Sequence, residues 1–80
     1  MHETYLIKPI IQEIAAHAER EGANKVLKVR LRIGELTGVK EESFKATFEI
    51  VAQGTLLEGA ELEFSFFPSA QIEVLSFDID

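Results

Sequence analysis

The first three residues, Met1-His2-Glu3, bring together several potential metal ligands. The α-amine of Met1, the imidazole and backbone nitrogen of His2, and the backbone nitrogen of Glu3 can wrap around one ion in fused chelate rings. Four nitrogen donors in a plane suit Ni(II) or Cu(II), whereas Zn(II) prefers a tetrahedral set. The alternative interpretation is that His2 belongs to a terminal tail or a tag remnant and binds no ligand.

The remaining residues offer no catalytic arrangement. His17 lies at the edge of an apolar helical stripe, where a histidine is usually a boundary residue, and 15 helical residues would separate it from His2 by about 22 Å. The chain contains neither a glycine-rich nucleotide loop nor a His-Glu-x-x-His sequence, and no Ser or Thr has a histidine base at a recognisable spacing. The sequence therefore predicts a protein that is not an enzyme.

Composition narrows the class further. The 80 residues include 8 Lys plus Arg, 14 Asp plus Glu and no Cys, giving a net charge of −6. An acidic chain lacks the basic footprint that nucleic acid or an anionic membrane requires. Without cysteine there is no thiolate zinc site and no disulfide. Because we also find no signal peptide and no apolar run of about 20 residues, we expect one cytoplasmic domain over residues 1–80.

Two stretches have helical periodicity and would position the N-terminal residues. The first ends near Glu21, before Gly22, and begins either near Leu6 to Lys8 or earlier with a kink at Pro9, because proline fits only a first helical turn without distortion. The second spans Glu41–Gln53 and ends before Gly54. Their apolar sides comprise Ile7, Ile10, Ile11, Ile14, Ala15 and Ala18 in the first, and Phe44, Phe48, Val51 and Ala52 in the second.

Three stretches alternate with a period of two, which predicts strands over Lys25–Ile33, Glu61–Phe67 and Ile72–Ile79. A turn over Gly34–Gly38 follows the first strand, and residues 68–71 form a short bridge between the last two. The side chains expected to point inward are Leu27, Val29, Leu31 and Ile33; Leu62, Phe64 and Phe66; and Leu75, Phe77 and Ile79.

The order helix, strand, helix, strand, strand predicts an α+β fold, in which two helices pack on one face of a three-stranded mixed sheet. The other face would carry Lys28, Arg30 and Arg32 beside carboxylates of the neighbouring strands. We interpret this face as solvated and charge-paired; the alternative is a docking patch for an acidic partner.

Three segments at their relative spacing resemble one family. They are Met1-His2-Glu3, Leu31-Arg-Ile-Gly-Glu-Leu-Thr-Gly-Val39 and Gly54-Thr-Leu-Leu-Glu-Gly-Ala-Glu-Leu-Glu63. The chain is similar to the HypA family of metallochaperones, which load nickel into [NiFe]-hydrogenase and, in some bacteria, urease. The resemblance implies a nickel-binding domain in which Met1, His2 and Glu3 hold Ni(II).

The chain departs from the family pattern in three places. Family members insert a zinc lobe with two Cys-x-x-Cys pairs between the last two strands, where this chain has only the bridge, so no zinc is expected. Lys40 stands where the family often has an acidic residue, and Pro9 lies in a helix that the family usually continues regularly. Lys40 would bring a positive charge near the bound cation, and Pro9 would loosen the geometry that holds His2 and Glu3.

Two functions therefore remain open. The first is a nickel-binding module that passes Ni(II) to or from a GTPase of the HypB type and then to the hydrogenase large subunit, docking through Lys8, Gln12 and Arg20 on the first helix. The second is a metal-free interaction or scaffold domain of the same fold. The short bridge also allows a homodimer in which the last strand is exchanged between chains.

Overall fold

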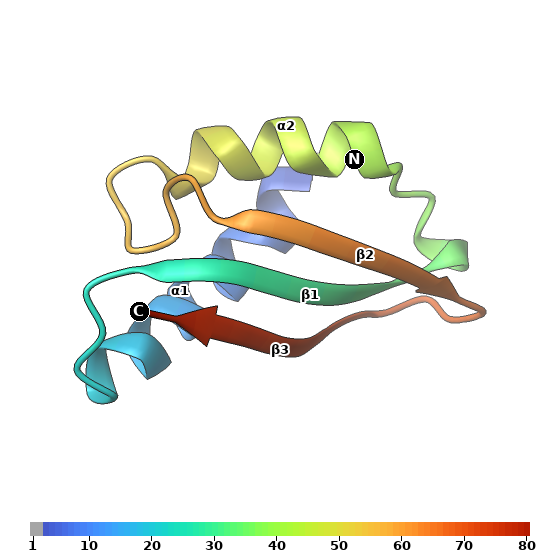
Figure 1. Cartoon of the computed structure of the whole chain (residues 1–80). Helices are drawn as coiled ribbons and strands as arrows, with labels where there is room; N and C mark the ends of the chain where they lie inside the picture. Colours follow the sequence, from blue (N-terminus) through green and yellow to red (C-terminus); the bar gives the residue numbers. More distant parts are fainter. Residues whose placement is uncertain (1–2) are drawn as a thin grey trace.

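The computed structural model describes residues 3–80, and its elements follow the predicted order (Figure 1). Helices α1 (Glu3–Arg20) and α2 (Glu41–Ala52) lie on one face of a three-stranded mixed sheet, and a single 3-10 turn, η1, spans Glu35–Thr37. The strands are β1 (Val26–Gly34), β2 (Glu61–Phe67) and β3 (Ile72–Ile79). The predicted α+β architecture is confirmed.

Helix α1 begins at Glu3 and continues through Pro9. The predicted start near Leu6 to Lys8 is therefore wrong, and the earlier start is the one the fold adopts. Proline has no N–H to donate, so the carbonyl of Tyr5 receives no helical hydrogen bond from position 9. Tyr5 and Pro9 are both exposed residues, so the proline lies on the outer side of the helix.

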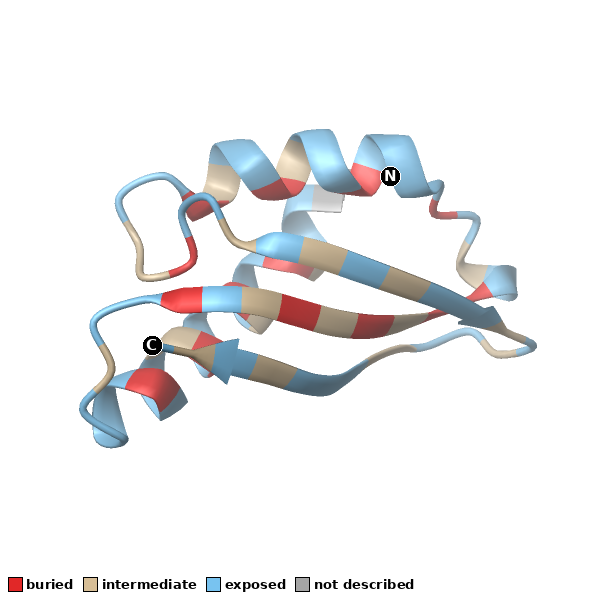
Figure 2. Ribbon diagram, in the orientation of Figure 1, coloured by how far each residue is buried: buried red, intermediate tan, exposed pale blue. Residues whose placement is uncertain are grey.

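Strand β1 is central in the order β2-β1-β3, parallel to β2 and antiparallel to β3. Because both helices cover it, its helix-facing side chains are at most 1% exposed (Figure 2). These are Val26, Val29, Leu31 and Ile33, and they belong to one core with the stripe Ile7, Ile11, Ile14 and Ala18 of α1 and with Phe44, Phe48 and Ala52 of α2.

Three side chains that alternation assigned to the core are instead exposed: Leu27 (47%), Phe66 (45%) and Leu75 (54%). The β1–β3 register shifts between Val26 and Lys28 and between Arg30 and Leu31, which leaves Leu27 and Leu75 as extra residues. Such bulges interrupt strict alternation, so Val26 rather than Leu27 completes the buried row of β1. Phe66 keeps its expected side, opposite Ile33, but the outer side of β2 pairs with no other strand among residues 3–80.

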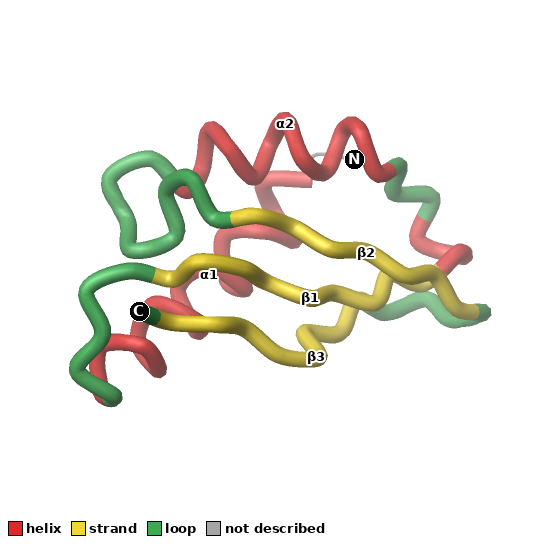
Figure 3. The backbone as a smooth tube through the Cα atoms, in the orientation of Figure 1, coloured by secondary structure: helices red, strands yellow, loops and turns green. Residues whose placement is uncertain are grey.

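Strands β2 and β3 are consecutive in sequence but lie on opposite sides of β1, so that residues 68–71 must cross the end of the central strand (Figure 3). Two strand spacings are about 10 Å, and four extended residues reach about 13 Å. The backbone N–H groups of Gly34 and Leu36 donate to the carbonyls of Gln71 (2.7 Å) and Ser69 (2.9 Å). The last strand thus returns to β1 within the same chain.

Candidate functional site

Of the three predicted metal-binding residues, the structure describes only Glu3. Met1 and His2 lie outside the described residues, and the helix begins at Glu3. The N–H groups in the first turn of a helix have no acceptor within that helix. The backbone nitrogen of Glu3 therefore belongs to a set that helical hydrogen bonding leaves unused.

The first turns of α1 lie beside η1 and the bridge. Leu6 and Ile10 line a hollow of about 320 Å³ together with Thr37, Ala70, Gln71 and Ile72. Segments that are far apart in the sequence thus meet at the end of the fold where α1 starts.

The segment Gly34–Val39 serves the architecture of this junction. The hydroxyl of Thr37 donates to the carbonyl of Gly34 (2.7 Å) and accepts from the N–H of Val39 (3.2 Å), which holds η1 in place. Gly38 ends the turn with a φ of +75°, a left-handed conformation that favours glycine. Leu36, within η1, is 77% exposed.

The second segment with family-like sequence uses the same device after α2. The hydroxyl of Thr55 donates to the carbonyl of Ala52 (2.7 Å) and accepts from the N–H of Leu57 (3.1 Å). This turn places Leu57 in the core with no exposed surface. Both internal segments therefore specify turns.

The three predicted partner-binding residues, Lys8, Gln12 and Arg20, are all exposed on α1. Lys8 and Gln12 line a shallow hollow of about 510 Å³ together with Thr4, Tyr5 and Pro9. Tyr5, which the sequence pattern did not single out, is 83% exposed there. Arg20 follows Gln12 by two helical turns and does not line this hollow.

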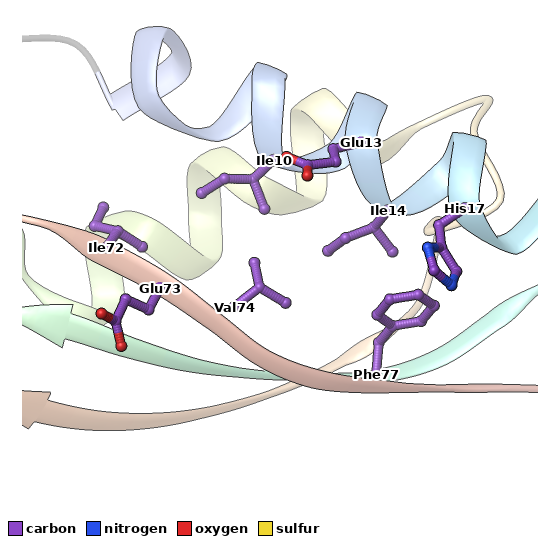
Figure 4. Close-up of a pocket in the computed structure, with 8 residues that line it drawn as sticks. All are labelled: Ile10, Glu13, Ile14, His17, Ile72, Glu73, Val74 and Phe77. Carbon is purple, nitrogen blue, oxygen red and sulfur yellow. The ribbon is translucent and has the colours of Figure 1, made fainter.

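His17 faces the groove between α1 and β3 (Figure 4). Its ring lies 5.5 Å from that of Phe77 in an edge-on arrangement, so it is an exposed side chain packed on the boundary of the core, as expected. Within residues 3–80, no three His, Asp or Glu side chains come together in a way that could hold a metal ion.

The open face of the sheet is charge-paired. Arg30 donates two hydrogen bonds to Asp78 (2.9 and 3.1 Å), Arg32 contacts Glu73 (2.8 Å), and Lys28 contacts Glu63 (3.1 Å). The hydrogen bonds from Arg30 lower the pKa of the Asp78 carboxyl from its ordinary value. The cations of β1 are thus neutralised within the fold, which supports the solvated-face interpretation over a docking patch for an acidic partner.

Neither helix within residues 3–80 combines the length and the apolar character needed to cross a bilayer.

Comparison with known proteins adds independent findings. The family model for the hydrogenase/urease nickel incorporation metallochaperone HypA matches residues 1–72. The hydrogenase maturation factor HypA of Dehalococcoides mccartyi strain CBDB1 is 44% identical over 69 residues, which cover 86% of this chain and 58% of that protein. The hydrogenase maturation factor HypA of Thermococcus kodakarensis is 44% identical over 64 residues, which cover 80% and 46% of the two chains. The chain thus spans about half the length of these curated relatives.

The fold has solved counterparts. The solution structure of the Ni metallochaperone HypA from Helicobacter pylori superposes with a TM-score of 0.82 and 19% identity, covering 99% of this chain and 97% of that chain. A second solution structure of a HypA protein gives a TM-score of 0.80 at 18% identity. At these identities the likeness concerns the fold.

Proposed function

Because the chain belongs to the HypA family of hydrogenase/urease nickel-incorporation metallochaperones, we propose that it binds Ni(II) through its first three residues and passes the ion on. The proposed donors are the Met1 amine, the imidazole and backbone nitrogen of His2, and the backbone nitrogen of Glu3. The observation that carries this proposal is a family match that begins at residue 1, on a chain whose first helix begins at Glu3. Metal delivery is a binding function, which agrees with the absence of a catalytic arrangement in the sequence.

The charge of the complex fits a helix start. A helix N-terminus carries partial positive charge and disfavours a nearby cation. Binding through two deprotonated backbone nitrogens would cancel the two charges of Ni(II), leaving an uncharged complex. The same neutrality would reduce the effect of Lys40, which is exposed between η1 and α2.

We further propose that the ion is exchanged with a GTPase of the HypB type in the cytoplasm and then reaches the hydrogenase large subunit. A site at the chain terminus suits exchange because no buried cage has to open. The hollow lined by Tyr5, Lys8 and Gln12 lies one to three turns from the proposed donors, so a partner docked there would be close to the ion. No resident zinc is required for this step.

The alternative is a metal-free scaffold domain that keeps only the partner surface. The exposed lysine at position 40 and the proline within α1 favour this alternative. Nickel binding by the isolated chain separates the two functions.

Nickel affinity should rise with pH. We expect calorimetric titration of the chain with a native, untagged N-terminus to give about one Ni(II) per chain. The affinity should increase at least about tenfold per pH unit below the histidine pKa of about 6.5, because the donors must lose protons to bind. Adding two residues ahead of Met1 removes the amine from its chelate ring and should weaken binding strongly. A Ni(II) affinity that changes neither with pH nor with this extension would contradict the proposed donor set.

Docking through α1 predicts a charge-sensitive interface. The double substitution Lys8→Glu with Gln12→Ala should weaken binding to the purified GTPase about tenfold, as for other exposed residues central to an interface. Arg20→Glu, two turns beyond the hollow, is the comparison. Its effect on GTPase affinity tests whether Arg20 also belongs to the docking surface. Unchanged GTPase affinity in the double variant would exclude this face as the docking surface.

A further inference from the structure

The outer edge of β2 carries none of the features that normally keep a strand edge unpaired. Its seven residues pair in unbroken register with β1, from Lys28 opposite Glu61 to Gly34 opposite Phe67, and contain no bulge, lysine or proline. A regular free edge of this kind is a template for pairing with another chain. The opposite edge of the sheet, β3, is interrupted by the bulge at Leu75.

The acidic residues of β2 do not protect this edge either. The carboxylate of Glu63 lies 3.1 Å from the ammonium of Lys28 and 3.8 Å from the guanidinium of Arg30, and Glu61 lies 3.6 Å from Lys28. Their negative charge is therefore balanced by β1. A second strand approaching β2 would meet paired charges rather than a repulsive row.

The helix-facing side of β2 carries an exposed aromatic ring and a groove at different ends of the same strand. Phe66, opposite the buried Ile33, is 45% exposed. Four residues earlier, Leu62 lies beside α2 in a groove of about 220 Å³, whose lining comprises Lys45, Phe48, Glu49, Ala60, Glu61 and Leu62. The aromatic ring and the groove are thus separated along the direction in which an antiparallel partner strand would run.

We propose that two copies of this chain pair antiparallel through their β2 edges about a two-fold axis at Phe64. This register sets Phe66 opposite Leu62 of the partner subunit and directs each phenyl ring to the partner's groove. On the open face it sets Ser65 opposite Glu63 of the partner subunit, so no two like charges oppose one another. The arrangement uses the same patch on both copies and closes on itself, as two-fold interfaces do.

The interface is small. One seven-residue edge and two phenyl rings bury less than the 1,200–2,000 Å² typical of stable complexes, by a rough comparison with interfaces of known size. We therefore expect a reversible dimer whose population rises with concentration. It goes beyond the proposed nickel function and does not depend on it.

Charge substitution at Ser65 tests the register. Sedimentation velocity on the 80-residue chain, from about 10 μM to about 1 mM, should show a monomer–dimer equilibrium for the unmodified protein. Ser65→Glu should raise the dimer dissociation constant, because it creates two symmetric repulsive pairs with Glu63 across the interface. Ser65→Lys should lower the dissociation constant, because it makes the same two pairs attractive. Each change should be about two- to thirtyfold.

The Ser65 variants should change the stability of the monomer in the opposite direction to their effect on association. Within one chain Ser65 lies opposite Arg32, so glutamate at position 65 should stabilise the monomer and lysine should destabilise it. Thermal unfolding of dilute samples measures this effect separately from association. An association change that follows the unfolding change would overturn the proposal.

Two further variants distinguish the edges. Phe66→Ser should raise the dissociation constant about tenfold or more, whereas Leu75→Ser, at an exposed position on β3, should leave it unchanged. A chain that stays monomeric at all concentrations overturns the proposal. A dimer whose dissociation constant does not change with the charge at position 65 also overturns it. That result is expected if the two chains exchanged their last strands instead.

Discussion

Replacing Gly34 with alanine should lower the free energy of unfolding by about 2–4 kcal/mol, a large part of the stability of so small a domain. A Cβ at this position would lie 2.6 Å from the carbonyl oxygen of Gln71 and would also overlap that of Ser69. Both are backbone atoms, fixed by hydrogen bonds from Gly34 and Leu36. The bridge could accommodate a methyl group only by leaving β1, which would loosen the attachment of β3.

The cause of this cost is steric, since the φ of Gly34 is −69° and any residue adopts that conformation. Gly22→Ala is the matched control: its φ is +78°, but no atom lies within 4 Å of an added Cβ. Its expected cost is about 1 kcal/mol, from backbone conformation alone. Urea unfolding followed by circular dichroism measures both variants. Equal losses would contradict the close approach of the bridge to β1.

His2→Ala should lower Ni(II) affinity by about a hundredfold or more, because the imidazole is one of four proposed donors and alanine cannot replace it. Loss of a residue that merely supports a metal ligand already costs about 10–100-fold. The core of the fold is built from Ile7 onward, so we expect the unfolding temperature of the metal-free chain to stay unchanged. Calorimetric titration of both proteins at neutral pH provides the measurement.

His17→Ala is the control for this substitution. It removes the other histidine, whose ring packs edge-on against Phe77, and should cost about 0.5–1.5 kcal/mol of stability without changing nickel affinity. If His2→Ala binds nickel as tightly as the unmodified chain, the ion is held elsewhere. If the unmodified chain does not bind nickel either, the scaffold alternative is favoured.

Local patterns in the sequence were sufficient to predict the helices and strands and their order along the chain. The predicted strands Glu61–Phe67 and Ile72–Ile79 agree with β2 and β3, and the second helix differs by one residue at its end. Periodicity succeeds here because the backbone geometry of a helix or strand sets which neighbours share a face. Pro9 shows the limit of a local rule, because the helix continues through this exposed position instead of starting near it.

The proposed nickel donors are also a local property, because they come from three consecutive residues and need no long-range contact to be recognised. The internal family-like segments carry a different kind of information. Gly34, Thr37 and Thr55 suggested only turns in the sequence, and their hydrogen bonds show what the turns do. The turn at Thr37 lies beside the first turns of α1, whereas the turn at Thr55 lies beside its second half.

Sequence alone thus determined the order of elements and the candidate donors, each of which depends on neighbours along the chain, whereas the ion pairs of the open sheet face join residues more than 30 positions apart. The tertiary structure decided the strand order, the bulges at Leu27 and Leu75, and the approach of the bridge to Gly34. It also left Phe66 exposed at an edge. These features depend on which distant segments pair, and side-chain periodicity does not encode the pairing.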